Sequence, residues 1–289
     1  MRVQVPFFTG MFDADSVPAV LAAQRSFGAL DLAFGRSPDG ATLPQTLRQE
    51  GALKVRLPTA HEGPLQAIVM NTAGGLTGGD RLEMDVRVDA GAALCVSGQA
   101  CEKLYKSAGG DATVTTRLSV AAGASLEWLM QPAILFDRSA LARKLTADIT
   151  GDARLLAVEA LVFGRTAMAE QVCTGRVAET WRIRRDGKPI YADALRLEND
   201  VKTALARRFV LNGQAAMATL LYVAADATDR CADLRESLAS LEDCTGAASA
   251  WNGLLAARLV APDGYALTRG LVDLLTRFRH IPPPRSWTL

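Results

Sequence analysis

Histidine is scarce in this sequence, with only His61 and His280 among 289 residues. Zinc hydrolases, histidine-based catalytic triads and non-haem iron centres usually draw on several imidazoles. The scarcity argues against a stable zinc or nickel site within the chain and leaves general acid–base catalysis by histidine unsupported. We therefore expect no tightly bound cofactor, and we expect both histidines to be ordinary surface or partly buried residues.

The sequence also lacks a paired-cysteine motif. Its five cysteines, an odd number, include no C-x-x-C pair, which favours reduced thiols in a cytoplasmic protein. Cys101, next to Glu102, has the softness of a metal ligand, but a buried structural thiol is the more ordinary role of a free cysteine.

Neither a strong charge nor a long apolar run is present. Lysine and arginine total 32 against 31 acidic residues, a net charge of +1, and no basic cluster is interleaved with aromatic residues. This balance argues against nucleic-acid binding. No apolar run reaches membrane-spanning length, and the N-terminus lacks the apolar core of a signal peptide. We expect a cytoplasmic protein that binds neither nucleic acid nor membrane.

What the sequence does contain is a series of short alternating segments between residues 25 and 200. Apolar and polar residues alternate at 30–34, 53–55 and 114–120, which is typical of half-buried strands. Asp186 and Gly187 separate two further segments of this kind and predict a hairpin. The sequence therefore predicts a mainly β structure.

Three segments in this region resemble one another: residues 88–94, residues 120–126 and, more weakly, residues 149–155. Each one joins the end of a strand through a glycine turn to the start of another strand. Such a repeat, roughly every 30 residues, predicts stacked β-sheets resembling a β-helix or solenoid rather than a closed barrel. The alternative is three unrelated hairpins that share the same turn chemistry.

The character of the sequence changes after about residue 225, where leucines recur at helical rather than strand spacing. We expect a single domain over residues 1–289, with a β body over about 1–225 and a helical C-terminal part over about 226–289. Because the strands come first and the helices last, we expect a mainly β structure that becomes α+β at the C-terminus, with two C-terminal helices.

Both C-terminal helices are predicted from leucine stripes. The first is expected over residues 229–244 and the second over residues 266–279, with Asp263 or Thr268 as the cap of the second. Residues 281–285 contain three consecutive prolines, which exclude a helix and predict an extended tail.

Residues 71–80 form the most unusual segment, a glycine-rich loop with the sequence NTAGGLTGGD. A glycine-rich loop after a strand suggests a phosphate cradle, but a P-loop requires Lys and then Ser or Thr where this chain has Asp80 and Arg81. A carboxylate there would repel phosphate, and the next segment alternates like a strand instead of opening a helix. These residues favour a tight connection between strands, and a nucleotide-binding enzyme is the least favoured interpretation.

Five segments, in order along the chain, carry the motifs of one protein family. The glycine loop supplies the most recognisable signature, through Asn71, Gly74, Gly75, Gly78, Gly79 and Asp80. The other segments are QACEKLYKS at 99–107, LEWLMQPAILF at 126–136, GRTAMAE at 164–170 and PRSW at 284–287. Taken together, from residue 25 to residue 287, the chain resembles the UreD (UreH) family of urease accessory proteins.

The resemblance implies a protein that is not an enzyme. Members of this family act as scaffold chaperones in nickel insertion into urease, and they bind apo-urease on one side and a UreF–UreG assembly on the other. UreG is a GTPase that carries nickel, so the implied partners are urease apoprotein, UreF and, through UreF, UreG. The resemblance also implies stacked β-sheets with two helices near the C-terminus and an internal tunnel as the route for Ni²⁺.

A nickel route needs groups that bind the ion weakly enough to release it, which suits carboxylates better than several imidazoles or thiolates. Asp80, Glu159 and Glu170 lie within otherwise apolar β-segments and are our candidates for a transient nickel path. Glu159 is the strongest of these candidates, because it interrupts the apolar run 155–163 and burying an ionised carboxylate in a dry core costs free energy. The alternative is that each acid pairs with an arginine or caps a backbone group.

A second hypothesis is a passive adaptor, with nickel travelling outside this chain. In that case the C-terminal helices and the tail at Trp287 would recruit the partners, although the same leucine stripes are equally consistent with core packing. The sequence does not identify the residues that contact each partner. A bulky residue at a small inward position separates the hypotheses, because a conduit is blocked by it and an adaptor is not.

Overall fold

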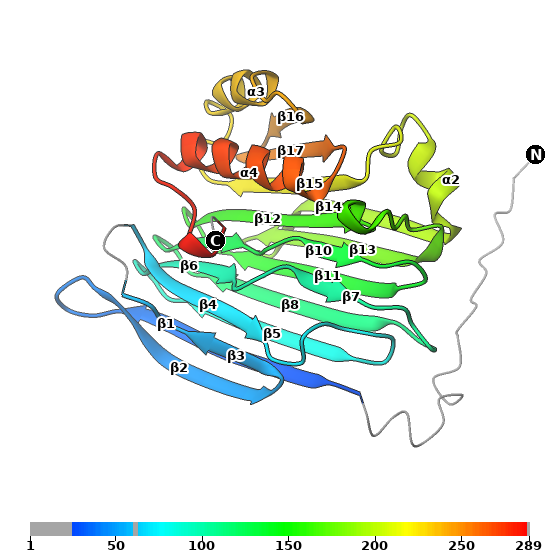
Figure 1. Ribbon diagram of the computed structural model, residues 1–289. Coiled ribbons are helices and arrows are strands. Elements are labelled where there is room, and N and C mark those ends of the chain that lie inside the picture. The colour runs from blue at the N-terminus through cyan, green and yellow to red at the C-terminus, as the bar shows by residue number, and fades with distance from the viewer. Residues whose placement is uncertain (1–24, 60–62, 288–289) are drawn as a thin grey trace, which may run out of the picture.

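The structure is a computed structural model and describes residues 25–59 and 63–287. His61 and the N-terminal segment considered for a signal sequence lie outside these residues. Two β-sheets face each other, and helices near the C-terminus lie over one of them (Figure 1). The predicted class, mainly β with stacked solenoid-like sheets and helices near the C-terminus, is confirmed.

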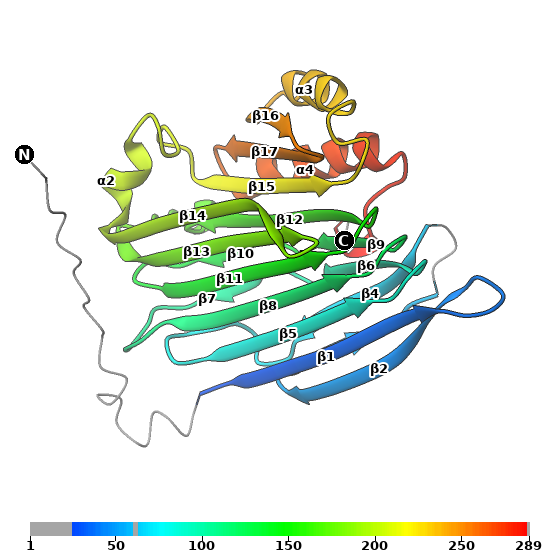
Figure 2. The ribbon, with the colours of Figure 1, turned by 180° about the vertical axis from the view of Figure 1, so that it is seen from behind.

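One sheet has seven strands in the order β14-β13-β11-β8-β5-β1-β2 and faces the viewer in Figure 2. Its inner strands run parallel, whereas β2 and β14 add antiparallel edges. Asp186 and Gly187 form the predicted hairpin turn between β13 and β14. The strands are β1 (Phe27–Arg36), β2 (Thr42–Gly51), β5 (Arg81–Val88), β8 (Ala112–Val120), β11 (Ala140–Ile149), β13 (Thr174–Arg185) and β14 (Lys188–Asp200).

The second sheet has ten strands, of which β4, β6, β9 and β12 are parallel neighbours. Antiparallel strands extend it at both edges, and the short β7 and β10 pair beside β12. The strands are β3 (Leu53–Arg56), β4 (Leu65–Asn71), β6 (Ala93–Gly98), β7 (Glu102–Leu104), β9 (Ser125–Leu129), β10 (Ala133–Leu135), β12 (Arg154–Phe163), β15 (Ala216–Val223), β16 (Thr245–Trp251) and β17 (Leu254–Ala261).

The chain passes between the sheets through stacked turns, as the internal repeats predict. Each of the three repeated segments joins a strand of the first sheet to a strand of the second, β5 to β6, β8 to β9 and β11 to β12. Successive turns are hydrogen-bonded: Ala121 N–H donates to Val88 O at 2.9 Å, and Thr150 N–H donates to Val120 O at 3.0 Å. The segments are therefore consecutive coils of one β-solenoid and not unrelated hairpins.

The described residues contain three α-helices, α2 (Val201–Ala206), α3 (Cys231–Ala239) and α4 (Gly264–Arg279). α3 and α4 lie over the outer face of the ten-stranded sheet, beside β15, β16 and β17 (Figure 1). Their leucine stripes, including Leu234 and Leu271, are buried in a core shared with this sheet. These stripes therefore serve core packing within the chain.

One detail of the C-terminal part, the length of α3, differs from the prediction. α4 has the expected cap, since the Asp263 carboxylate accepts the Ala266 N–H at 2.8 Å. α3, however, is shorter than residues 229–244, because the chain leaves the helix after Ala239 to enter β16, which with β17 extends the sheet. The tail after α4 is packed on the chain itself: Trp287 is buried, and its Nε1–H donates to Leu129 O at 3.1 Å.

The main hydrophobic core lies between the two sheets, and a second core lies between the ten-stranded sheet and the helices. β12 is therefore buried on both faces, which accounts for its nearly unbroken apolar sequence. Within residues 25–59 and 63–287, no helix has the length and apolar character that crossing a membrane requires.

Candidate functional site

Four of the five signature segments, all except residues 284–287, meet at one end of the solenoid. They lie about one coil apart in the sequence, so the stacking of coils brings them side by side. Backbone hydrogen bonds join them in succession: Tyr105 N–H to Leu76 O at 2.7 Å, Phe136 N–H to Leu104 O at 3.0 Å, and Gly164 N–H to Leu135 O at 2.8 Å. Motifs that are separate in the sequence are thus joined by a continuous series of backbone hydrogen bonds.

The glycine loop connects β4 to β5 and is packed tightly against the next coil. Gly75 has φ +142°, and a Cβ at this position would collide with the Tyr105 ring. A Cβ on Gly78 would collide with the backbone carbonyls of Gly109 and Gly110. Glycine is therefore required by close approach of the chain, which agrees with the predicted tight connection between strands.

Asp80 closes this loop through backbone hydrogen bonds. Its carboxylate accepts the Thr77 N–H at 2.8 Å and the Ser26 N–H at 2.7 Å, and only 4% of the residue is exposed. Both carboxylate oxygens therefore have N–H donors, which explains how this acid is accommodated in the core. The observed contacts are those of a backbone cap.

A cavity of about 230 Å³ lies between the sheets beneath the loop. Its outer wall includes the exposed Gly74 and the half-buried Asn71 and Glu102. Its inner wall includes the buried side chains of Arg143 and Glu159. The remaining wall is largely apolar and includes Met70, Cys101 and Met130. A small, partly polar interior space therefore begins at the signature loop.

Glu102 is the acid on the outer side of this cavity. The Asn71 amide donates to both of its carboxylate oxygens at 3.1 Å, and Asn71 Oδ1 accepts the Ala73 N–H at 3.0 Å. Burial raises the pKa of Glu102, and the Asn71 hydrogen bonds oppose that rise. Burial also raises the pKa of the neighbouring Cys101 thiol, so this half-buried cysteine favours its neutral form.

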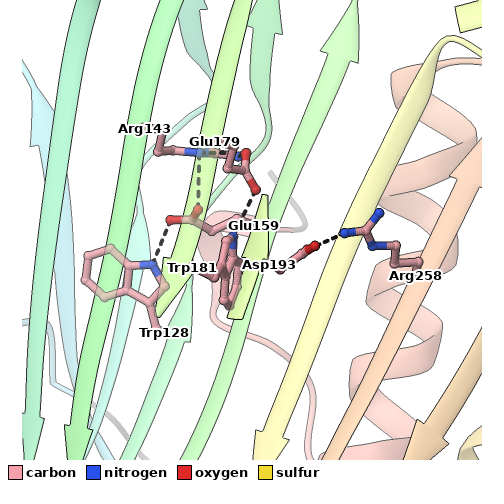
Figure 3. A network of polar contacts seen from close by, with 7 residues as sticks. All are labelled: Trp128, Arg143, Glu159, Glu179, Trp181, Asp193 and Arg258. Atoms are coloured by element: carbon pink, nitrogen blue, oxygen red, sulfur yellow. Dashed lines mark hydrogen bonds and ion pairs between the residues drawn. The ribbon is translucent and has the colours of Figure 1, made fainter. Parts of the chain in front are cut away.

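On the inner side, one arginine is shared by two glutamates (Figure 3). Arg143 Nε and Nη2 both donate to Glu179 Oε2, the first at 3.1 Å. Arg143 Nε also lies 3.1 Å from Glu159 Oε2. Each glutamate has an indole donor as well: Trp128 Nε1–H to Glu159 at 3.2 Å, and Trp181 Nε1–H to Glu179 at 2.9 Å. The cluster is held between the sheets by three consecutive solenoid strands, β11, β12 and β13.

The charge balance of this cluster perturbs Glu159. Arg143, Glu159 and Glu179 are each less than a tenth exposed, so one positive charge faces two negative charges away from water. Burial raises the pKa of Glu159 to about 7; the Arg143 charge opposes this rise, and the Glu179 charge adds to it. Glu159 therefore changes its protonation state near neutral pH.

Glu170 lies elsewhere, in the short connection after β12. It forms an ion pair with Arg165, and its carboxylate also lies 3.4 Å from the Asp137 N–H. The Arg165 guanidinium is 4.1 Å from the centre of the Phe136 ring, which in turn meets Tyr105 edge-on at 5.1 Å. Glu170 thus belongs to the solenoid end and not to the cavity wall.

The structure does not bring the three predicted acids together. Of Asp80, Glu159 and Glu170, only Glu159 borders the cavity, and the described residues contain no cluster of three or more His, Cys, Asp or Glu side chains arranged to hold a metal. Sequence reasoning missed Arg143 and Glu179. Both occupy inward positions of alternating strands, where an apolar residue is expected, and this mismatch is the signal that marks them.

Comparison with known proteins gives one family. Residues 26–288 match the family described as UreD urease accessory protein. The chain is 44% identical to "Urease accessory protein UreD" of Rhizobium leguminosarum bv. viciae over 275 residues, which cover 95% of this chain and 99% of the relative. It is 46% identical to the protein of that name from Rhizobium etli over 252 residues, with 87% and 91% coverage.

A third relative comes from another genus and is covered to a similar extent. "Urease accessory protein UreD 1" of Brucella melitensis biotype 1 is 43% identical over 274 residues, which cover 93% of this chain and 96% of the relative. The match extends over the solenoid, the helices and the packed tail. The chain therefore belongs to the UreD family of urease accessory proteins.

Proposed function

We propose that this protein acts in the cytoplasm as a non-catalytic scaffold and nickel conduit, which links a UreF–UreG GTPase assembly to apo-urease while the nickel centre of urease is assembled. The observation that carries the proposal is the cavity between the sheets, which has carboxylates at its outer and inner walls. Oxygen ligands such as these bind Ni²⁺ less tightly than clustered imidazoles or thiolates do, which favours passage over storage.

Within this proposal, the transient path runs from Glu102 past the apolar wall to Glu159. Asp80 and Glu170 flank the path at the solenoid end, where Asp80 holds the loop and Glu170 holds Arg165. Replacing Glu159 and Glu170 with alanine should lower the nickel content of urease while the accessory complex stays assembled. Normal urease activation in that double variant would contradict a role for these acids in the path.

Blocking the cavity tests the conduit more directly. Val114 lies on β8, faces the cavity and is only partly buried, so the larger side chain in Val114→Phe has space to enter. We expect Val114→Phe to reduce nickel loading of urease several-fold, whereas Val114→Ala at the same position should leave loading unchanged. Co-purification of the complex and the melting temperature of each variant show whether assembly and folding are preserved.

The alternative is a passive adaptor that only joins its partners. It predicts equal nickel loading with Val114→Phe and Val114→Ala, provided that both variants assemble. The burial of α3, α4 and Trp287 within the chain removes their apolar faces as docking surfaces, so an adaptor would have to use other residues.

A further inference from the structure

The Arg143 cluster contains one carboxylate oxygen that lacks a hydrogen bond. The single proton of Arg143 Nε is directed at Glu179 Oε2, so its 3.1 Å approach to Glu159 Oε2 is a charge contact only. Among the described residues, no other donor reaches Glu159 Oε2, although this atom is inaccessible to solvent. A buried carboxylate oxygen without a donor is costly, and this one belongs to a residue in the wall of the cavity.

The two glutamates hold the arginine unequally. Glu179 accepts from both Nε and Nη2 of Arg143 and is fixed by the Trp181 indole. Glu159 has the Trp128 indole on its other oxygen and meets Arg143 through charge alone. Because a charge-assisted fork of two N–H bonds is much stronger than an unaligned contact, Glu179 is the anchor of the guanidinium and Glu159 is the partner that can be released.

We infer that Arg143 controls whether a divalent cation in the cavity can bind Glu159. The guanidinium places a positive charge at the inner wall, which repels a cation and neutralises the carboxylate that would bind it. When a divalent ion takes Glu159 Oε2 as a ligand, Arg143 keeps both of its N–H bonds to Glu179. This inference rests on the proposed function only in taking the cavity as a place that Ni²⁺ reaches.

Nickel quenching of Trp128 fluorescence measures this access in the full-length chain, without urease. Trp128 lines the cavity and donates to Glu159, and a paramagnetic Ni²⁺ bound there quenches an indole at contact distance. The rate of quenching is followed after rapid mixing with NiCl₂. Trp128→Phe identifies the part of the signal that belongs to this site, because the sequence contains four tryptophans.

The informative variant is the double substitution Arg143→Met with Glu179→Gln. It removes one positive and one negative charge, so the formal charge of the cluster stays at −1, and the amide oxygen that replaces the Glu179 carboxylate would still offer an acceptor to Trp181. We expect Trp128 quenching to become about tenfold faster or more, since a unit charge a few ångströms from a divalent ion has a large effect in a partly buried site. Adding Glu159→Gln should abolish the gain.

Arg143→Lys is the matched control, because it keeps the positive charge and should keep the slow rate of the unsubstituted protein. Equal quenching rates in the unsubstituted chain and the Arg143→Met, Glu179→Gln variant, both folded by circular dichroism, would overturn the inference. That outcome would leave the proposed function intact if Val114→Phe still lowered urease loading. Conversely, faster quenching combined with normal loading of urease by Val114→Phe would support the role of Arg143 and contradict the conduit.

Discussion

Two glutamate–arginine pairs occupy very different surroundings in this protein. In the Glu159–Arg143 pair inside the solenoid, the side chains are 3% and 8% exposed, whereas in the Glu170–Arg165 pair at the solenoid end they are 22% and 41% exposed. The inner pair requires two indole donors and a second glutamate, while water solvates the outer pair. The same type of ion pair therefore contributes differently to stability in the two places, because only the outer pair is accessible to water.

The largest expected effect comes from removing the inner arginine alone. Arg143→Met leaves two carboxylates buried without their counter-charge, which should lower the free energy of unfolding by roughly 3–5 kcal/mol. Denaturant unfolding measures the loss. Arg165→Met is the matched control at the solenoid end, and equal losses in the two variants would show that burial does not distinguish the pairs.

The second prediction concerns the pH dependence of stability. The pKa of Glu159 rises from 4.5 in the unfolded chain to about 7 in the folded protein, so the native state binds more protons than the unfolded state between these values. The contribution of this residue to stability therefore falls as the pH rises from about 4.5 to 7 and is lowest above that window.

Glu159→Gln keeps the shape of the side chain and an acceptor for Trp128 but cannot ionise. Thermal unfolding across the same pH range should therefore show a flatter profile for this variant than for the unsubstituted chain. Val114→Ala, which removes no ionisable group, serves as the comparison and should keep the original profile. Parallel profiles for Glu159→Gln and the unsubstituted chain would show that Glu159 titrates normally.

Asp80 provides an intermediate case, since it is as buried as Glu159 but is satisfied by backbone N–H groups. Asp80→Ala leaves the Thr77 and Ser26 donors without an acceptor, and we expect a loss of about 1–3 kcal/mol in the free energy of unfolding. Asp85→Ala on the following strand removes only a half-exposed contact with Arg117 and should change stability by less than about 0.5 kcal/mol. A similar loss in both variants would refute the capping role.

The smallest effect is expected at the outer pair. Glu170→Gln should cost only about 0.2–1 kcal/mol, because an exposed ion pair is weakened by water and by side-chain freedom. Its contribution should also fall in high salt, since ions screen exposed charges. A loss as large as that of Arg143→Met would mean that the connection after β12 depends on this pair for its folding.

Much of the architecture was accessible from the sequence because it is encoded locally. The alternation at residues 30–34 identified a strand with one buried face, and the repeated glycine turns identified the solenoid coils. Asp263 marked the start of α4. The end of α3 was not predicted, since the leucine spacing continues beyond Ala239 while the chain turns into β16. The periodicity of apolar residues shows which face of an element is buried. It does not show where the chain leaves a helix to pair with a sheet.

The sequence by itself determined that Glu159 is anomalous, because a charged residue interrupts an apolar strand. Only the tertiary structure decided how that charge is accommodated. Its partners, Arg143 and Glu179, lie on strands of the opposite sheet, and they are themselves 36 residues apart. Which side chains meet between the sheets depends on the register of β11 with β13 and on how these strands face β12. That register results from long-range pairing and core packing, which no local pattern of residues specifies.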